Sequence, residues 1–197
     1  MRRILGAGLE SRLYRLPGIE RVNAFEVDLP AVQDDKKKKI QKYFGRLPEH
    51  VTFIPIDFDT QTLEDVFAGT PFDLSRPAMF IWEGVTQYIT EEAVRRTLAF
   101  VGKSAPGSIL VFTYIVKSII ERRSDIPGAD QLMDVVAQDS SWIFGLEPSS
   151  IPAILKPFHL SLIADGGNAD YQEKYLKPLG WSLVVSEGER IALAIVD

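Results

Sequence analysis

The first 28 residues constrain the fold of this chain more than any other segment. A short apolar stretch at residues 3–5 runs directly into Gly6-Ala7-Gly8, and a helix-like segment at 12–16 follows. A second apolar segment at 23–28 ends in acidic residues. Strand, glycine turn, helix, strand and acid form the order of a nucleotide-binding βαβ unit. The segment therefore predicts a parallel strand pair with a ligand site at its glycine turn.

The residue types of this segment indicate the class of ligand. Gly6 permits a tight turn, and Gly8 lets a ligand lie against bare backbone. The carboxylates of Glu26 and Asp28, at the end of the second strand, can accept hydrogen bonds from ribose hydroxyls. A dinucleotide site prefers glycine or alanine where this chain has Ser11, so the match to that fingerprint is incomplete. We interpret the segment as a site for an adenosine-bearing cofactor.

The composition excludes several other classes of site. The 197 residues suffice for one domain, and a net charge of −5 gives no electrostatic support for nucleic-acid binding. The chain has no cysteine, which excludes disulfides, thiolate nucleophiles and cysteine-ligated metals. Its two histidines, His50 and His159, make a histidine-rich metal site improbable, so no metal is expected.

No apolar run is long enough to span a bilayer, because the longest stretch, 109–116, includes Thr113 and Tyr114. The glycine turn begins at residue 6, which leaves no room for a secretory signal. We therefore expect a cytoplasmic protein without a membrane partner.

Strand and helix signals alternate along most of the chain. Beyond the first two strands, further strands are predicted at residues 51–55, 78–82, 108–114, 181–185 and 190–196, with helices at 30–44, 63–67, 90–103 and 169–176. Continuous apolar strands separated by helices indicate a parallel sheet covered on both faces. The last two predicted strands form a hairpin, which adds an antiparallel C-terminal strand. The predicted fold is α/β, a doubly wound, mostly parallel, seven-stranded Rossmann-like sheet, as in class I methyltransferases.

The sequence also predicts the domain organisation. Residues 1–197 are expected to form a single domain, with a helical insertion or lid at about 115–168 that lines an acceptor pocket.

The lysine run 36–39 falls within a predicted helix, where consecutive residues spread around the axis. We interpret this run as a solvated surface.

Several ordered blocks resemble the leucine carboxyl methyltransferase-like family of S-adenosylmethionine (SAM)-dependent enzymes. The blocks are Leu5-Gly6-Ala7-Gly8-Leu9-Glu10-Ser11-Arg12, Tyr14-Arg15-Leu16, Phe25-Glu26-Val27-Asp28-Leu29-Pro30, Pro55-Ile56-Asp57-Phe58, Trp82-Glu83-Gly84-Val85-Thr86-Gln87-Tyr88-Ile89-Thr90 and Ala105-Pro106-Gly107-Ser108. The resemblance covers residues 3 to about 115 well and the rest more loosely.

The resemblance implies SAM as cofactor, S-adenosylhomocysteine (SAH) as product, and a role for each matching residue. Gly6 and Gly8 would pass under the methionine part of SAM, and Glu26 or Asp28 would hold the ribose. The other cofactor positions implied in this way are Asp57 and Phe58 at the adenine and Glu83 at the methionine or sulfonium side.

Family members usually carry several helices before the first strand, whereas here that strand begins at once. Either the chain is a truncated or minimal form, or a partner chain completes the pocket. The second alternative implies a homo-oligomer that covers an otherwise exposed apolar face.

The methyl acceptor is expected to be a carboxyl or hydroxyl group of a small molecule or of a protein carboxyl terminus. A carboxylate is already ionised at neutral pH and needs a clamp, for which Arg12, Arg15 and Tyr88 are the candidates. A hydroxyl would need a base, and His159 is a candidate. Two alternatives stay open: an NAD-dependent oxidoreductase, and a noncatalytic SAM-binding relative.

Overall fold

The computed structural model describes residues 2–126, 129–139, 142–183 and 185–197, and these contain one seven-stranded sheet. Its strands are β1 (Arg2–Leu5), β2 (Ala24–Asp28), β3 (Val51–Pro55), β4 (Met79–Trp82), β5 (Ile109–Ile115), β6 (Leu160–Gly166) and β7 (Glu189–Val196), in the spatial order β3-β2-β1-β4-β5-β7-β6. The strands β1 to β5 pair in parallel, and β7 runs antiparallel to both of its neighbours. The predicted α/β class, with a mostly parallel sheet and an antiparallel C-terminal strand, is confirmed.

Helices connect the strands. They are α1 (Arg12–Arg15), α2 (Pro30–Phe44), α3 (Leu63–Phe67), α4 (Glu91–Gly102), α5 (Lys117–Ile120), α6 (Ala129–Asp139), α7 (Ile151–Leu155) and α8 (Asn168–Tyr171). Shorter turns are the 3₁₀ segments Ile19–Arg21, Thr86–Tyr88, Pro148–Ser150, Lys156–Phe158 and Lys177–Leu179 and the π-helical turn Gln172–Leu176. Two helices begin at threonine caps, because the hydroxyls of Thr62 and Thr90 accept hydrogen bonds from backbone amides of the first turn.

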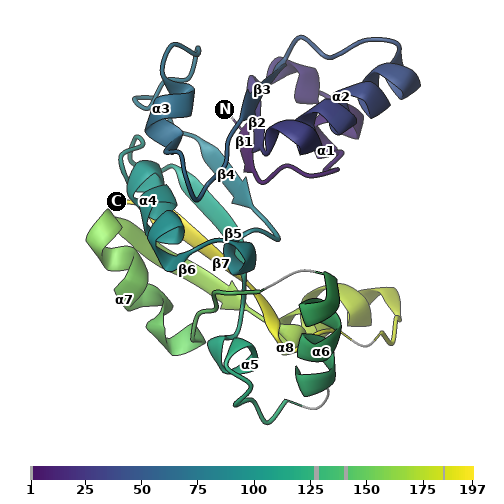
Figure 1. The fold of residues 1–197 in the computed structure, drawn as a ribbon, viewed down its shortest axis with the longest axis vertical. Coiled ribbons are helices and arrows are strands. Elements are labelled where there is room, and N and C mark those ends of the chain that lie inside the picture. The colour runs from purple at the N-terminus through teal and green to yellow at the C-terminus, as the bar shows by residue number, and fades with distance from the viewer. Residues whose placement is uncertain (1, 127–128, 140–141, 184) are drawn as a thin grey trace.

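The helices cover the two faces of the sheet unequally (Figure 1). On one face α3, α4 and α7 pack against the sheet, with α3 beside the edge strand β3 and α7 beside the edge strand β6. The main core lies on this face, with Trp82, Phe100 and Leu110 among its buried side chains. On the other face α1 and α2 lie together beside β1, β2 and β3, over a smaller core that includes Leu13 and Ile81. The helices α5 and α6 share a third apolar cluster.

Helix α2 turns a polar stripe toward the sheet. Gln33, Lys36 and Ile40 are its buried residues, at the spacing of one helical face. The Gln33 side-chain amide donates to the carbonyl oxygens of Glu26 (2.7 Å) and Ile54 (2.8 Å), which ties the helix to two strands. The prediction that residues 36–39 form a solvated surface is wrong for Lys36, because helical periodicity points this one lysine inward.

The hairpin prediction was wrong in its first strand. Residues 181–183 and 185 form no strand, and Trp181 and Leu183 are 57% and 54% exposed. The strand that pairs with β7 is instead β6, which lies within the predicted insertion. Both edges of β7 are occupied, by β5 and by β6, so no edge remains for residues 181–185 to pair with. The helical character expected for 115–168 therefore ends before β6.

Among the described residues, no helix combines the length and apolarity needed to cross a membrane.

Candidate functional site

The predicted cofactor residues gather at one edge of the sheet. Because β1 to β4 are parallel, their carboxyl ends meet at the same edge, which is where open α/β sheets bind ligands. Gly6 follows β1, Asp28 ends β2, Asp57 follows β3 and Glu83 follows β4. The structure thus brings together four segments that are dispersed over almost eighty positions of the sequence.

The tight turn after β1 requires glycine at its first position. The amides of Gly6 and Ala7 both donate to the carbonyl oxygen of Val27, at 2.7 and 3.1 Å, which bends the chain sharply off the strand. Gly6 has a φ of +69°, and a Cβ there would lie 1.9 Å from Cγ2 of Val85. Both the conformation and the close approach of the loop after β4 exclude a side chain.

Gly8 presents bare backbone at the edge of the sheet. An added Cβ would meet nothing within 4 Å, so the space above Gly8 is open. Its amide donates to Oδ2 of Asp28 at 2.6 Å, and the other carboxylate oxygen accepts from the Leu29 amide at 2.7 Å. Asp28 is half-buried. An acid held by backbone amides beside an open glycine can receive a hydroxyl-bearing ligand.

Glu26, the other predicted ribose ligand, lies inside the protein. Its side chain is fully buried, and its Oε2 lies 2.9 Å from Nζ of Lys36, whose side chain is 4% exposed. Burial raises the pKa of Glu26, and the charge of Lys36 partly opposes this shift. Because Glu26 is buried, it is not accessible to a ligand at the edge, and Asp28 stays the predicted ribose ligand. Sequence reasoning missed Lys36, although its spacing with Gln33 and Ile40 marks the inward face of the helix.

Arg12 joins the glycine turn to the loop after β4. Its Nη2 lies 2.7 Å from Oε2 of Glu83, and its Nε donates to Oε2 of Glu10 at 2.6 Å. The hydrogen bond to Glu10 is the largest cause of a raised pKa of Arg12, and Glu83 contributes to the same shift. Burial raises the pKa of Glu10, but the hydrogen bonds from Arg12 outweigh it and the net shift is downward. Arg12, proposed as an acceptor clamp, is thus shared between two acids.

The loop after β3 is folded around Asp57. Oδ1 of Asp57 accepts from the Asp59 amide at 3.1 Å, and the Asp57 amide donates to Oε1 of Gln61 at 3.0 Å. Phe58 is 8% exposed, with its ring centroid 6.5 Å from that of Trp82 in the main core. The structure therefore places Asp57 at the edge and turns most of the Phe58 ring inward.

The remaining candidates divide between the site and the rest of the molecule. Tyr88 ends the 3₁₀ turn that follows Glu83 and is 43% exposed. Nε of Arg15 donates to the Ser11 hydroxyl at 3.0 Å. His159 immediately precedes β6, and since β6 and β5 both run antiparallel to β7, this position is at the amino edge of the sheet. His159 is therefore at the edge opposite the predicted site, and its role as a base is corrected.

One acid at the carboxyl edge was not predicted. Glu189 begins β7 beside Ile115, and the nearby Thr113 side chain lowers the pKa of its carboxyl against the effect of burial. The Thr113 hydroxyl accepts from the Gly84 amide at 2.9 Å, in the loop that carries Glu83. Burial raises the pKa of Glu189, and Glu83 adds to the shift. No sequence signal singles out Glu189, because its neighbours come together only through the antiparallel pairing of β7.

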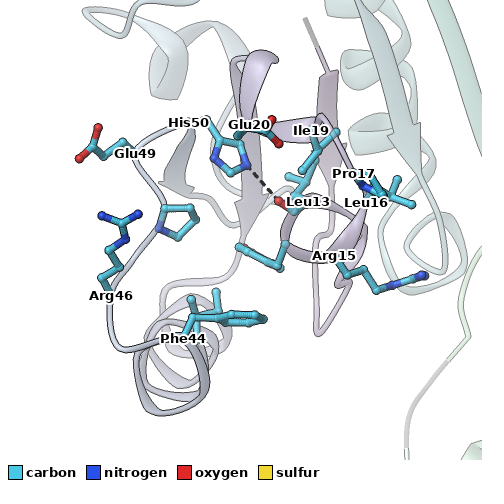
Figure 2. Close-up of a pocket in the computed structure, with 13 residues that line it drawn as sticks. Leu13, Arg15, Leu16, Pro17, Ile19, Glu20, Phe44, Arg46, Glu49 and His50 are labelled. Carbon is cyan, nitrogen blue, oxygen red and sulfur yellow. Dashed lines mark hydrogen bonds between the residues drawn. The ribbon is translucent and has the colours of Figure 1, made fainter.

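A large cavity lies elsewhere in the described part of the chain (Figure 2). It has a volume of about 750 Å³ and is bounded by α1, the end of α2 and the loop before β3. Nε2 of His50 lies 2.9 Å from the Leu13 carbonyl oxygen at its wall. The cavity is at the amino ends of β2 and β3, so it does not coincide with the edge that carries Asp28 and Glu83.

The fold is that of class I methyltransferases. An O-methyltransferase family protein from Burkholderia thailandensis superposes with a TM-score of 0.63 at 12% sequence identity, over 98% of this chain and 50% of that protein. Magnesium protoporphyrin IX methyltransferase from Synechocystis, solved with bound SAH, superposes with a TM-score of 0.59 at 14% identity, over 100% of this chain and 74% of that protein.

The chain belongs to the leucine carboxyl methyltransferase family, whose sequence profile matches residues 4–102, about half of the chain. The Bacillus subtilis protein YktD, named for S-adenosyl-L-methionine-dependent methyltransferase activity, is 29% identical over 136 residues, which are 68% of this chain and 44% of YktD. The similarly named Streptomyces coelicolor protein SCO7813 is 32% identical over 130 residues, 64% of this chain and 45% of that protein. The match thus spans less than half the length of these relatives.

Proposed function

We propose that this chain binds SAM and acts as a SAM-dependent O-methyltransferase. The acceptor in this proposal is a carboxyl or hydroxyl group of a small molecule or of a protein carboxyl terminus. The observation that carries the proposal is the open backbone of Gly8 beside the half-buried Asp28 carboxylate at the carboxyl edge of the sheet. The names of the related proteins support the same cofactor. Neither the family nor these relatives favour the nicotinamide-dependent alternative.

The residues present fit an adenosyl cofactor laid along this edge. Asp28 would accept hydrogen bonds from the ribose hydroxyls, since its oxygens can accept further bonds beside those from Gly8 and Leu29. Asp57, one strand further out, would hold the adenine side. Glu83, in the opposite direction along the edge, would face the positively charged end of the cofactor. The strands lie in the order β3-β2-β1-β4, so Asp57, Asp28 and Glu83 follow one another along the edge in the order adenine, ribose and sulfonium.

When bound, SAM would supply a methyl group on a sulfonium, which an ionised acceptor oxygen would take up as the C–S bond breaks and its electron pair stays on sulfur. The contribution of the protein is then alignment and exclusion of water. The turn at Gly6 and Gly8 would position one side of the cofactor, and Glu83, held by Arg12, would orient the other. Because Arg12 already pairs with two acids, Tyr88 is more available than Arg12 to contact the acceptor.

The decisive experiment is calorimetric titration of the purified chain with SAM, SAH and NAD. The wild type is compared with Asp28→Ala and with Asp125→Ala, a matched change at an exposed residue in the loop before α6. Binding of SAM or SAH that is lost in Asp28→Ala and kept in Asp125→Ala would support the proposal. Binding of NAD alone would overturn it. Cofactor binding without methyl transfer to any tested hydroxyl or carboxyl compound would favour the noncatalytic alternative.

A further inference from the structure

One peptide group of the glycine turn is held from both of its ends. Ala7 O and Gly8 N belong to the same planar, trans peptide, so they point in opposite directions. Nζ of Lys36 donates to Ala7 O at 3.2 Å from inside the protein. Oδ2 of Asp28 accepts from Gly8 N at 2.6 Å on the side of the open edge. The two contacts together set which way this peptide faces.

Both contacts trace back to the same strand. Lys36 is itself held by Glu26, at 2.9 Å, and Glu26 and Asp28 are two positions apart on β2, so they lie on one face of the sheet. One acid therefore holds the carbonyl end of the peptide through Lys36, and the other holds the amide end directly. The centre of the Tyr14 ring lies 5.5 Å from Nζ of Lys36.

A clamp is needed here because the turn contains glycine. Gly8 has a φ of +41°, and glycine reaches positive and negative φ with similar ease. The rotation that reverses the Ala7–Gly8 peptide would therefore meet little steric resistance at Gly8. Reversal would turn the Ala7 carbonyl oxygen toward Asp28, where it would repel the carboxylate and remove the amide donor that now holds it. Glycine makes the turn possible, but it does not choose between the two orientations.

We propose that Lys36, paired with Glu26, is a positioning residue of the cofactor site that locks the Ala7–Gly8 peptide with its amide toward Asp28. The expected effect of Lys36 on cofactor affinity rests on the proposed function. The orientation of the peptide itself does not depend on that function. Lys36 does not contact the cofactor in this proposal, because it is buried beneath the turn.

The test compares two variants that differ only at residue 36, whose side chain contacts Ala7 O. Lys36→Met alone would leave a buried, unpaired carboxylate and could simply unfold the chain. Glu26→Gln puts an amide oxygen in place of the carboxylate beside the buried ammonium group and keeps the contact of that group with Ala7 O. Glu26→Gln/Lys36→Met removes that contact and leaves no buried charge. Comparing these two variants isolates the clamp. Lys38→Met, at an exposed position of the same helix, is the matched control.

Two readouts separate the clamp from the proposed function. We expect SAH to bind the double variant about tenfold or more weakly than Glu26→Gln, the effect of losing one well-placed hydrogen bond. We expect the Gly8 amide to exchange with solvent faster in the double variant, although the melting temperature of that variant should be no lower, because it buries no unpaired charge. Equal exchange rates in the two variants would overturn the clamp. Equal SAH affinities would overturn its role in cofactor binding.

A wild-type chain that binds neither SAM nor SAH would instead overturn the proposed function. The Gly8 exchange rates would still decide whether Lys36 orients the peptide. The two failures are therefore distinguishable in the same set of proteins.

Discussion

Arg12 and Glu83 are 71 positions apart in the chain, and 2.7 Å separates Nη2 of the arginine from Oε2 of the glutamate. The pair joins α1 to the loop after β4 across the carboxyl edge of the sheet. Both residues come from sequence blocks that were assigned separate roles, one at the acceptor and one at the cofactor. Their contact makes Glu83 a fixed negative charge at the site rather than a freely rotating surface acid.

The first prediction uses this fixed charge. Glu83→Gln should weaken SAM binding by about fivefold, the effect of an exposed charge pair, and should weaken SAH binding less. The difference arises because SAM carries a sulfonium cation and SAH a neutral thioether. Calorimetric titration of both compounds measures it, with Glu91→Gln on α4 as the control. Equal losses for SAM and SAH would show that Glu83 does not face the sulfonium.

The second prediction separates the two glycines of the turn. Gly6→Ala should destabilise the chain by on the order of 2–4 kcal/mol, because it combines an unfavourable φ with overpacking against Val85. Gly8→Ala meets open space and should cost only about 1 kcal/mol, through its φ alone. Urea denaturation measures both values. Adding Val85→Ala to Gly6→Ala should restore part of the lost stability, and no recovery would contradict the steric explanation.

The third prediction concerns the pH dependence of stability. The pKa of Glu189 is raised in the folded state above 4.5, its ordinary value. Between these two pKa values the folded state binds more protons than the unfolded state. The contribution of Glu189 therefore lowers the free energy of unfolding as pH rises. Glu83, Tyr171 and Arg190 are the charged or titratable groups that share its surroundings.

Glu189→Gln should therefore raise the free energy of unfolding at pH 7, by on the order of 1 kcal/mol or less because solvent screens a half-buried group. The gain should vanish below pH 4.5, where the wild-type carboxyl is protonated in both states. Thermal unfolding at a series of pH values tests this, with the exposed Glu49→Gln as control. A gain that is independent of pH would rule out the electrostatic explanation.

The fourth prediction tests which segment pairs with β7. Leu160 at the start of β6 is 2% exposed, so Leu160→Asp should cost more than about 3 kcal/mol by burying an unpaired charge. Leu183, in the segment first expected to be that strand, is exposed, and Leu183→Asp should stay within about 0.5 kcal/mol of the wild type. Chemical denaturation distinguishes the two. A large loss for Leu183→Asp alone would restore the original hairpin.

The sequence was most informative where structure is local. The glycine turn, the five parallel strands and the threonine-capped helices follow from apolar runs, turn residues and caps that lie next to one another in the chain. Pairing between distant segments was not accessible in the same way. Residues 181–185 look more like a strand than residues 160–166, which include Asp165 and Gly166, and only the occupied edges of β7 decide between them.

The candidate site shows the same division. Gly6, Gly8, Asp28, Asp57 and Glu83 could be placed at one edge because each follows a predicted parallel strand. The burial of Glu26 was missed, because it depends on Lys36, which was interpreted as part of a solvated run although helical spacing places it on the inward face. The position of His159 was also out of reach, since its edge of the sheet depends on the direction of β6.

The place of β7 between β5 and β6 has a consequence for how the chain is made. β5 and β6 do not contact each other directly, and each completes its pairing only when β7 enters between them. During synthesis on the ribosome both strands emerge before β7, with their facing edges unpaired. This half of the sheet is then the part of the described fold most open to wrong strand pairing in the nascent chain until β7 has been translated.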